Sequence, residues 1–140
     1  MRMSQEFPEN IQQPEEIEGQ LERGDVAAKI REVLSREGVD EEDFNVAPET
    51  REAYALLLRW CREQEAKIKA ETEEAAVTDW KRLQFEIERV RLYQESGMPK
   101  TALANAEQSY RAGCRLEEAG GDISDLLDTL EVLRDELKGA

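Results

Sequence analysis

The chain has 140 residues, of which 33 are acidic, 19 are basic and none is histidine, so its net charge at pH 7 is −14. Without histidine, the Ser-His-Asp and Cys-His catalytic devices, His-ligated zinc fingers and His-containing di-iron bundles are excluded. Apolar residues make up 39% and charged residues 37%, a balance typical of helices with one wet face, and no apolar run approaches the ~20 residues of a membrane span.

The N-terminal tail comes first. Residues 1–13 offer no periodic apolar face, so we expect disorder there and a single helical domain over 14–140. No hydrophobic stretch of the secretory type begins the chain, which favours a cytoplasmic protein. Pro14 is suited to a first helical position, and Ile17 and Leu21 lie four residues apart, so a short helix is expected after the tail.

The next element is a helix over 26–37. Asp25 is a favourable N-cap, and Gly38 supplies the left-handed conformation in which helices often end. An apolar stripe runs along this helix through Val26, Ile30, Val33 and Leu34.

An acidic segment, "DEEDFN" at 40–45, separates this helix from the following one. Its spacing of carboxylates resembles a calcium loop, but the central glycine and the later bidentate glutamate of such loops are missing. We therefore interpret 40–45 as an acidic loop that caps a helix.

A strongly apolar helix follows, opened by Pro48. Residues 53–61 are apolar on most sides of the helix, and such a helix is normally surrounded by others. We therefore place the centre of the core at Leu57, Trp60 and Cys61. Cys61 and Cys114 lie far apart on apolar helix faces and are interpreted as small buried hydrophobic residues rather than a disulfide or metal site.

The apolar pattern thins over 62–78, where Ile68 is the one large aliphatic side chain before Val77. Helix propensity stays high, so this stretch could project as a single solvated rod within one helix of ~70 Å over 49–96. A break or bend near Thr78 is the other possibility, since the stripe that follows, 80–92, is out of phase with the preceding one. That stripe contains Trp80, Leu83, Ile87 and Val90, with Phe85 and Leu92 beside it.

A helical hairpin and a final helix complete the chain. Gly97 ends one helix and Pro99 opens the next, which carries a stripe of small residues that lets a neighbouring backbone approach closely: Ala102, Ala106, Ser109 and Gly113. After a glycine break, Asp122 is expected to cap a strongly amphipathic helix over 123–137.

The stretch "LYQESGMPKTALANAEQSYRAG" resembles one unit of a tetratricopeptide repeat, with Tyr93 near the end of the first helix, Gly97 in the turn and small residues on the second helix. The resemblance covers residues 86–119. The sequence departs from the family pattern in its first helix, where Glu86, Arg89 and Val90 replace the expected Trp, Leu and Gly. Ala106 also replaces the family's phenylalanine, and no proline closes the unit. The resemblance implies helical hairpins and a groove for a peptide or helix from another protein.

Other patterns bear on catalysis and on nucleic acids. Glu71 and Glu74 provide the first half of the magnesium site of all-α nucleotide pyrophosphatases, but no second half follows, so an enzyme is the least favoured class and no cofactor or metal is expected. The acids of the last helix, at Asp122, Asp125, Asp128 and Glu131, are interpreted as solvated charges favoured by its dipole. Basic residues interleaved with acidic ones over 59–91 are typical of a solvated face. Alternatively, they form a strip that contacts nucleic acid, with Trp60 and Trp80 stacking on the nucleobases.

The sequence therefore predicts an all-α protein, a small antiparallel bundle of four to five helices, with tetratricopeptide-like hairpins and one long central helix as a variant. Its expected function is protein binding or assembly without catalysis, with another protein or a second copy of the chain as partner. The alternatives are an acidic mimic of nucleic acid and an accessory subunit of a nucleic-acid-processing complex. The expected partner-binding residues are Ile68, Tyr93, Leu103 and Tyr110.

Overall fold

The computed structural model describes residues 21–71 and 75–139. In these residues the chain forms five α-helices and two short 3-10 helices and no strand: α2 (Arg23–Glu37), η1 (Glu41–Asp43), η2 (Pro48–Thr50), α3 (Arg51–Glu71), α4 (Ala75–Glu95), α5 (Pro99–Glu118) and α6 (Ser124–Gly139). The all-α prediction is confirmed. None of the described helices is long and apolar enough to cross a membrane.

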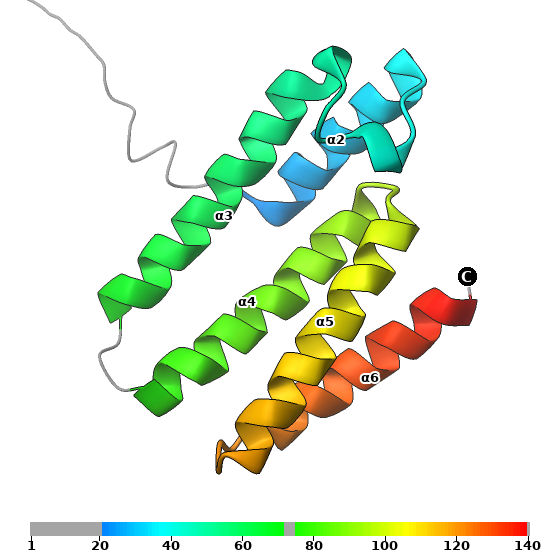
Figure 1. The fold of residues 1–140 in the computed structure, drawn as a ribbon. Coiled ribbons are helices and arrows are strands. Elements are labelled where there is room, and N and C mark those ends of the chain that lie inside the picture. The colour runs from blue at the N-terminus through cyan, green and yellow to red at the C-terminus, as the bar shows by residue number, and fades with distance from the viewer. Residues whose placement is uncertain (1–20, 72–74, 140) are drawn as a thin grey trace, which may run out of the picture.

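Helix α4 is the central element of the fold (Figure 1). It packs against α2, α3, α5 and α6, whereas α3 and α6 lie at opposite sides of the molecule. Successive helices run antiparallel, so α2, α4 and α6 point one way and α3 and α5 the other (Figure 1). The result is a row of helical hairpins in which every long helix has a neighbour along its length.

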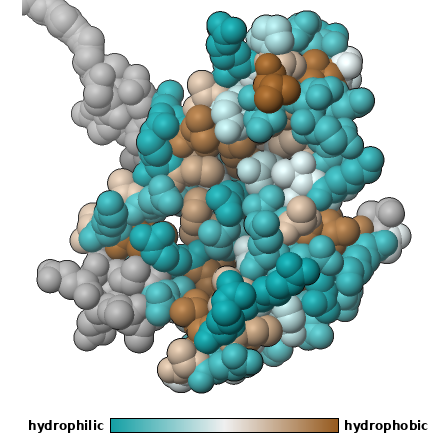
Figure 2. Space-filling view, viewed as in Figure 1, coloured by the Kyte–Doolittle hydropathy of each residue, from teal (hydrophilic) through white to brown (hydrophobic). Residues whose placement is uncertain are grey.

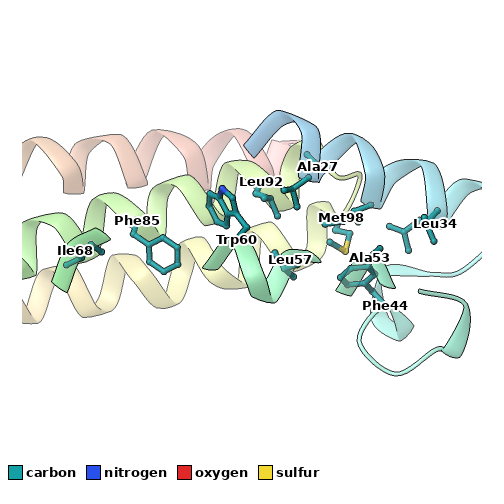
Figure 3. Close-up of a cluster of buried hydrophobic side chains, with 13 residues drawn as sticks. Ala27, Leu34, Phe44, Ala53, Leu57, Trp60, Ile68, Phe85, Leu92 and Met98 are labelled. Atoms are coloured by element: carbon teal, nitrogen blue, oxygen red, sulfur yellow. The ribbon is translucent and has the colours of Figure 1, made fainter. Parts of the chain in front are cut away.

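Two hydrophobic cores lie on opposite sides of α4. The first core joins α2, Phe44 directly after η1, α3 and one side of α4. Figure 3 shows a row of its side chains from Ile68 through Phe85 and Trp60 to Leu57. The second core joins the other side of α4 to α5 and α6. Within α4, the first core takes Phe85 and Leu92, and the second core takes Leu83, Ile87 and Val90.

This division explains the sequence of α4. Leu83, Ile87 and Val90 recur at helical spacing and form one stripe, and Phe85 and Leu92, seven residues apart, form another. Each fully buried side chain of this size contributes about 1.5–3 kcal/mol. One stripe of α4 therefore packs against α2 and α3, and the other packs against α5 and α6.

The turn between α4 and α5 has the predicted form. Gly97 has a φ of 81°, a conformation that costs glycine little, and Pro99 occupies the first turn of α5. The small-residue stripe of α5 is buried as expected, at Ala102, Ala106, Ser109 and Gly113. A Cβ added at Gly113 would lie 2.5 Å from Cδ2 of Leu127 in α6. The small stripe thus sets how closely α6 approaches.

The predicted helix over 26–37 is present as α2, with Gly38 in the left-handed conformation at its end. It begins earlier than expected, at Arg23, so its N-cap is Glu22 and not Asp25. The predictions of disorder over 1–13 and of a short helix after Pro14 concern residues outside the described part, apart from Leu21.

The long central helix and the solvated rod are corrected by the structure. Helix α3 ends at Glu71 and α4 begins at Ala75, ahead of the break expected at Thr78, and the two helices run side by side in opposite directions. Ile68, in the thin stretch, is only 7% exposed because it packs in the first core. Trp80, expected in the core, is 37% exposed, because it lies at the start of α4 beyond the side chains of both cores.

Candidate protein-binding groove

The four expected partner-binding residues lie in three different places. Tyr93 is half-buried at the end of α4, where it packs against both cores and lines an open groove. Ile68 lines a separate depression between α3 and α4. Leu103 and Tyr110 pack on the second core, and the ring of Tyr110 lies 4.7 Å from the guanidinium carbon of Arg134 in α6.

The groove at Tyr93 has a volume of about 280 Å³ and lies where η1, α3, α4 and α5 meet. We call it the tyrosine groove. Its apolar and aromatic lining comes from α3, from α4 and from the residues just after η1 and just before α5: Phe44, Tyr54, Leu57, Tyr93 and Met98. Its polar lining comes from the segment around η1 and from the start of α5: Glu41, Glu42, Asn45 and Thr101.

Hydrogen bonds between η1 and α5 hold one wall of the tyrosine groove in place. The Glu41 carboxylate accepts from the backbone N–H of Thr101 at 2.8 Å, from its hydroxyl at 2.9 Å and from the backbone N–H of Lys100 at 3.3 Å. These N–H groups belong to the first turn of α5, which has no partner for them within the helix. The acidic segment therefore caps a helix, as predicted, and the helix is one that begins 58 residues after Glu41.

A second set of contacts fixes the loop between η1 and η2. The hydroxyl of buried Thr50 donates to the carbonyl of Phe44, with an oxygen–oxygen distance of 2.5 Å, and lies 3.1 Å from the carbonyl of Ala47. The rings of Phe44 and Tyr54 meet edge to face with centroids 5.6 Å apart. The aromatic floor of the groove is thus preorganised.

Burial affects the titration of two groups near the floor. It raises the pKa of Tyr93, so this phenol keeps its proton well above neutral pH and remains a hydrogen-bond donor. It also raises the pKa of Cys61, which keeps this thiol protonated and unreactive at neutral pH. Cys61 and Cys114 are both free and half-buried.

A different kind of surface lies at the other end of the α3–α4 hairpin. Arg62 and Lys69 of α3 and Arg82 of α4 line a depression of about 330 Å³ together with Glu65 and Ala66. Trp80, with 37% of its surface exposed, precedes Arg82 by two residues, whereas Trp60 is buried. We call this surface the basic depression. It lies within the strip 59–91 that the sequence indicated.

Among the residues that the structure describes, no three Cys, Asp or Glu side chains converge as metal ligands would. The pair Glu71 and Glu74 is not covered, since the side chains of 71–78 are outside the described part. Asp122, which precedes α6, and Asp125, Asp128 and Glu131 of α6 are exposed.

Sequence reasoning missed Phe44, Tyr54 and Thr101 as groove residues. The only signal for Phe44 was an aromatic side chain inside an acidic loop, and nothing local places that loop against the start of α5. The packing of η1 on α5 is a long-range contact, which periodicity does not encode.

Comparison with known proteins leaves the chain without an assigned relative. No protein-family model, no curated protein and no solved structure matches it. The tetratricopeptide resemblance over 86–119 stays a prediction. The function of this chain therefore has to be inferred from its own geometry.

Proposed function

We propose that the chain is a cytoplasmic, noncatalytic helical module that binds another protein through the tyrosine groove. The observation that carries this proposal is a preorganised groove with an aromatic floor, from Phe44, Tyr54 and Tyr93, beside the carboxylates of Glu41 and Glu42. Tyrosine, phenylalanine and methionine are enriched in protein interfaces, and tyrosine offers apolar area together with a donor.

The lining defines the chemistry of the partner. The floor fits an apolar side chain, and the rim of carboxylates favours lysine or arginine beside it. The net charge of −14 would also increase the rate at which a basic partner is captured. We therefore expect a segment in which an aliphatic or aromatic residue is flanked by basic residues.

The arrangement of the helices supports a binding role. Parallel helices α2, α4 and α6 alternate with α3 and α5 (Figure 1), as in proteins built from stacked helical hairpins, whose surfaces commonly hold peptides. Figure 2 shows a mainly hydrophilic face with hydrophobic residues in small separate groups, so a local groove suits this surface better than a broad apolar interface.

A photo-crosslinking residue in the groove tests the proposal. Asn45 lines the groove and is exposed, whereas Asp125 is exposed at the start of α6, at the other end of the molecule. With benzoylphenylalanine at position 45, we expect one dominant adduct in the native cell, to a partner segment of the stated chemistry. The same substitution at position 125 should not give this adduct.

A positive charge introduced into the groove then tests the affinity. With the purified partner, Asn45→Arg should weaken binding about tenfold, the effect of about 1.4 kcal/mol, by placing a like charge beside the partner's basic residue. Asp125→Arg should leave the affinity unchanged. Equal labelling from both positions, or no change with Asn45→Arg, would refute the groove as the site. An adduct to the chain itself would identify self-association instead.

One observation favours a second candidate, the accessory role with nucleic acid. The basic depression gathers Arg62, Lys69 and Arg82 from two helices, and the exposed ring of Trp80 lies near them in the chain. Single strands are commonly bound by cations along the backbone and an aromatic ring against a base. The ion pairs that mix bases among acids elsewhere, such as Lys29 with Glu32, speak against a continuous acidic mimic surface.

Fluorescence titration with a single-stranded oligonucleotide tests this candidate. We expect quenching of tryptophan fluorescence that weakens steeply with salt, and that is lost in Arg82→Gln. Trp80→Phe should remove the quenching while Arg82 still binds. A titration without quenching at low salt would eliminate the accessory role at this surface.

A further inference from the structure

A depression between α3 and α4, on the side of the hairpin where α2 lies, is distinct from both surfaces described above. Its volume is about 200 Å³. Ile68 and Phe85 form its apolar floor, and Lys67 and Lys81 contribute positive charge. We call it the lysine groove. Its complete lining is Gln64, Lys67, Ile68, Lys81, Gln84, Phe85 and Glu88.

One end of the lysine groove lies beside the first residue of α2. Glu88, at one end of the groove, accepts a hydrogen bond of 2.8 Å from Nη1 of Arg23, the first residue of α2. Arg23 also donates to both carboxylate oxygens of Glu95, at 3.2 and 2.9 Å. Leu21, the first described residue, packs against the first core.

A contact farther along α2 fixes its direction. Nη1 of Arg31 donates to the backbone carbonyl of Glu95 at 2.8 Å, close to the end of α4. Helix α2 therefore runs parallel to α4, and its N-terminal end points along α4 from Glu88 toward Lys81. A segment that continued the direction of α2 before Leu21 would run along α4 beside the lysine groove.

The length of the chain before Leu21 matches the groove. Seven residues of α4 separate Glu88 from Lys81, a rise of about 10 Å in a helix. Residues 14–20 are also seven, and they would span about 10 Å as a helix or up to about 24 Å if extended. Either conformation reaches the far end of the groove.

The chemistry of residues 14–20 also matches. The segment "PEEIEGQ" has one large aliphatic side chain, Ile17, for an apolar floor made by Ile68 and Phe85. Its three glutamates, at positions 15, 16 and 18, are opposite in charge to Lys67 and Lys81. An acidic segment would be disfavoured at the tyrosine groove, where Glu41 and Glu42 lie.

We propose that residues 14–20 of the same chain occupy the lysine groove, with Ile17 against Ile68 and Phe85 and the glutamates beside Lys67 and Lys81. In this position the segment covers the apolar floor formed by Ile68 and Phe85. The surface of this hairpin that remains open to an outside partner is then the one on the far side, which contains the basic depression. The proposal is independent of the function proposed for the tyrosine groove.

Paramagnetic broadening in the full-length chain tests the position of the segment. A nitroxide is attached at Ile17→Cys, with Cys61→Ala and Cys114→Ala removing the native thiols. We expect strong broadening of the amide signals of Gln64 and Gln84, and none at Val132 on α6. Broadening at random positions, or none at the groove, would overturn the proposal.

A mixed sample separates the same chain from a second copy. When ¹⁵N-labelled chains without nitroxide are mixed with unlabelled chains that carry it, the groove signals should stay sharp. Broadening in this mixture would show that the segment docks on another molecule, which contradicts the proposal.

Matched substitutions test the contact of Ile17. In Ile17→Asp, amide hydrogen exchange over 82–88 should accelerate about fivefold, the effect of about 1 kcal/mol on a local opening. Ile11→Asp, which changes an isoleucine outside residues 14–20, should exchange as the unsubstituted chain does. Equal rates in the two variants would overturn the proposal.

Discussion

At the scale of single residues, the smallest side chain of α5 has the largest geometric effect. A Cβ at Gly113 would lie 2.5 Å from Cδ2 of Leu127 and 3.3 Å from Cδ2 of Leu83. The first distance is shorter than carbon atoms tolerate, so either α6 or the Leu127 rotamer has to move. Gly24, by contrast, has nothing within 4 Å of such an atom.

These distances predict opposite effects of the same substitution. Gly113→Ala should lower the free energy of unfolding by about 1–3 kcal/mol, because overpacking outweighs the higher helix propensity of alanine. Gly24→Ala should leave this free energy unchanged or raise it by up to about 1 kcal/mol. Urea denaturation followed by circular dichroism measures both, and a similar change in the two variants would contradict the close approach of α6.

Sequence reasoning worked for residues whose environment follows from local periodicity. The small stripe of α5 is buried, and Leu57 and Trp60 lie in the first core as predicted. The prediction that Trp80 lies in the core was wrong, because a periodic stripe does not show how far the neighbouring helices extend along it. Tyr93 was assigned from its place before the turn, and it does line a groove, but whether it binds a partner stays a prediction.

At the scale of elements, the second half of α3 shows how few apolar residues hold a stretch of helix against its neighbour α4. Among the described side chains of the thin second half of α3, residues 62–70, Ile68 alone is buried, and it meets Phe85 of α4 in the first core. Long charged side chains such as Lys67 also cover apolar surface with their methylene stems. Counting apolar positions therefore underestimates how well this stretch packs. The change of direction between α3 and α4 is also not signalled, because the sequence there contains no Gly or Pro.

The cap of α5 shows a second limit of local reasoning. An acidic loop was expected to cap a helix, and propensity rules look for that helix immediately after the loop. The structure places Glu41 on the first N–H groups of α5 instead. Only the tertiary fold brings these two segments together.

This cap gives a prediction for the stability of the α5 start. Glu41→Ala should lower the free energy of unfolding by about 1 kcal/mol, as the loss of other helix caps does, because two backbone N–H groups lose their acceptor. The neighbouring Glu42→Ala removes an exposed ion pair with Lys100 and should leave the unfolding midpoint where it is. Chemical denaturation of both variants checks this difference, and an equal loss would mean that the bonds to Thr101 contribute nothing.

At the scale of the whole molecule, the two cores depend on each other through α4. Leu92 of the first core and Val90 of the second are both fully buried and lie two residues apart on the same helix. A helix cannot unfold along one side only, since its backbone hydrogen bonds are shared by every face. Loss of either core should therefore remove the support of the other.

Unfolding experiments can test this coupling with Trp60 as the reporter of the first core. In a Trp80→Phe background, Leu133→Ala should remove about 2–5 kcal/mol from the second core. The midpoint from Trp60 fluorescence should then fall together with the midpoint from circular dichroism. Val132→Ala, at an exposed neighbouring position, should shift neither. A Trp60 midpoint that stays unchanged in Leu133→Ala would show that the cores unfold independently.

The shared helix also predicts how the chain tolerates random substitution. In α2, residues such as Ala28, Lys29 and Glu32 face solvent, so a large part of its circumference can vary. The circumference of α4 is occupied on both flanks by cores and near its end by the ion pairs of Arg23. A saturation library selected for folded protein should therefore retain the fewest alternatives per position in α4. Even a strongly diverged sequence with this fold would therefore be recognisable by the residues of α4.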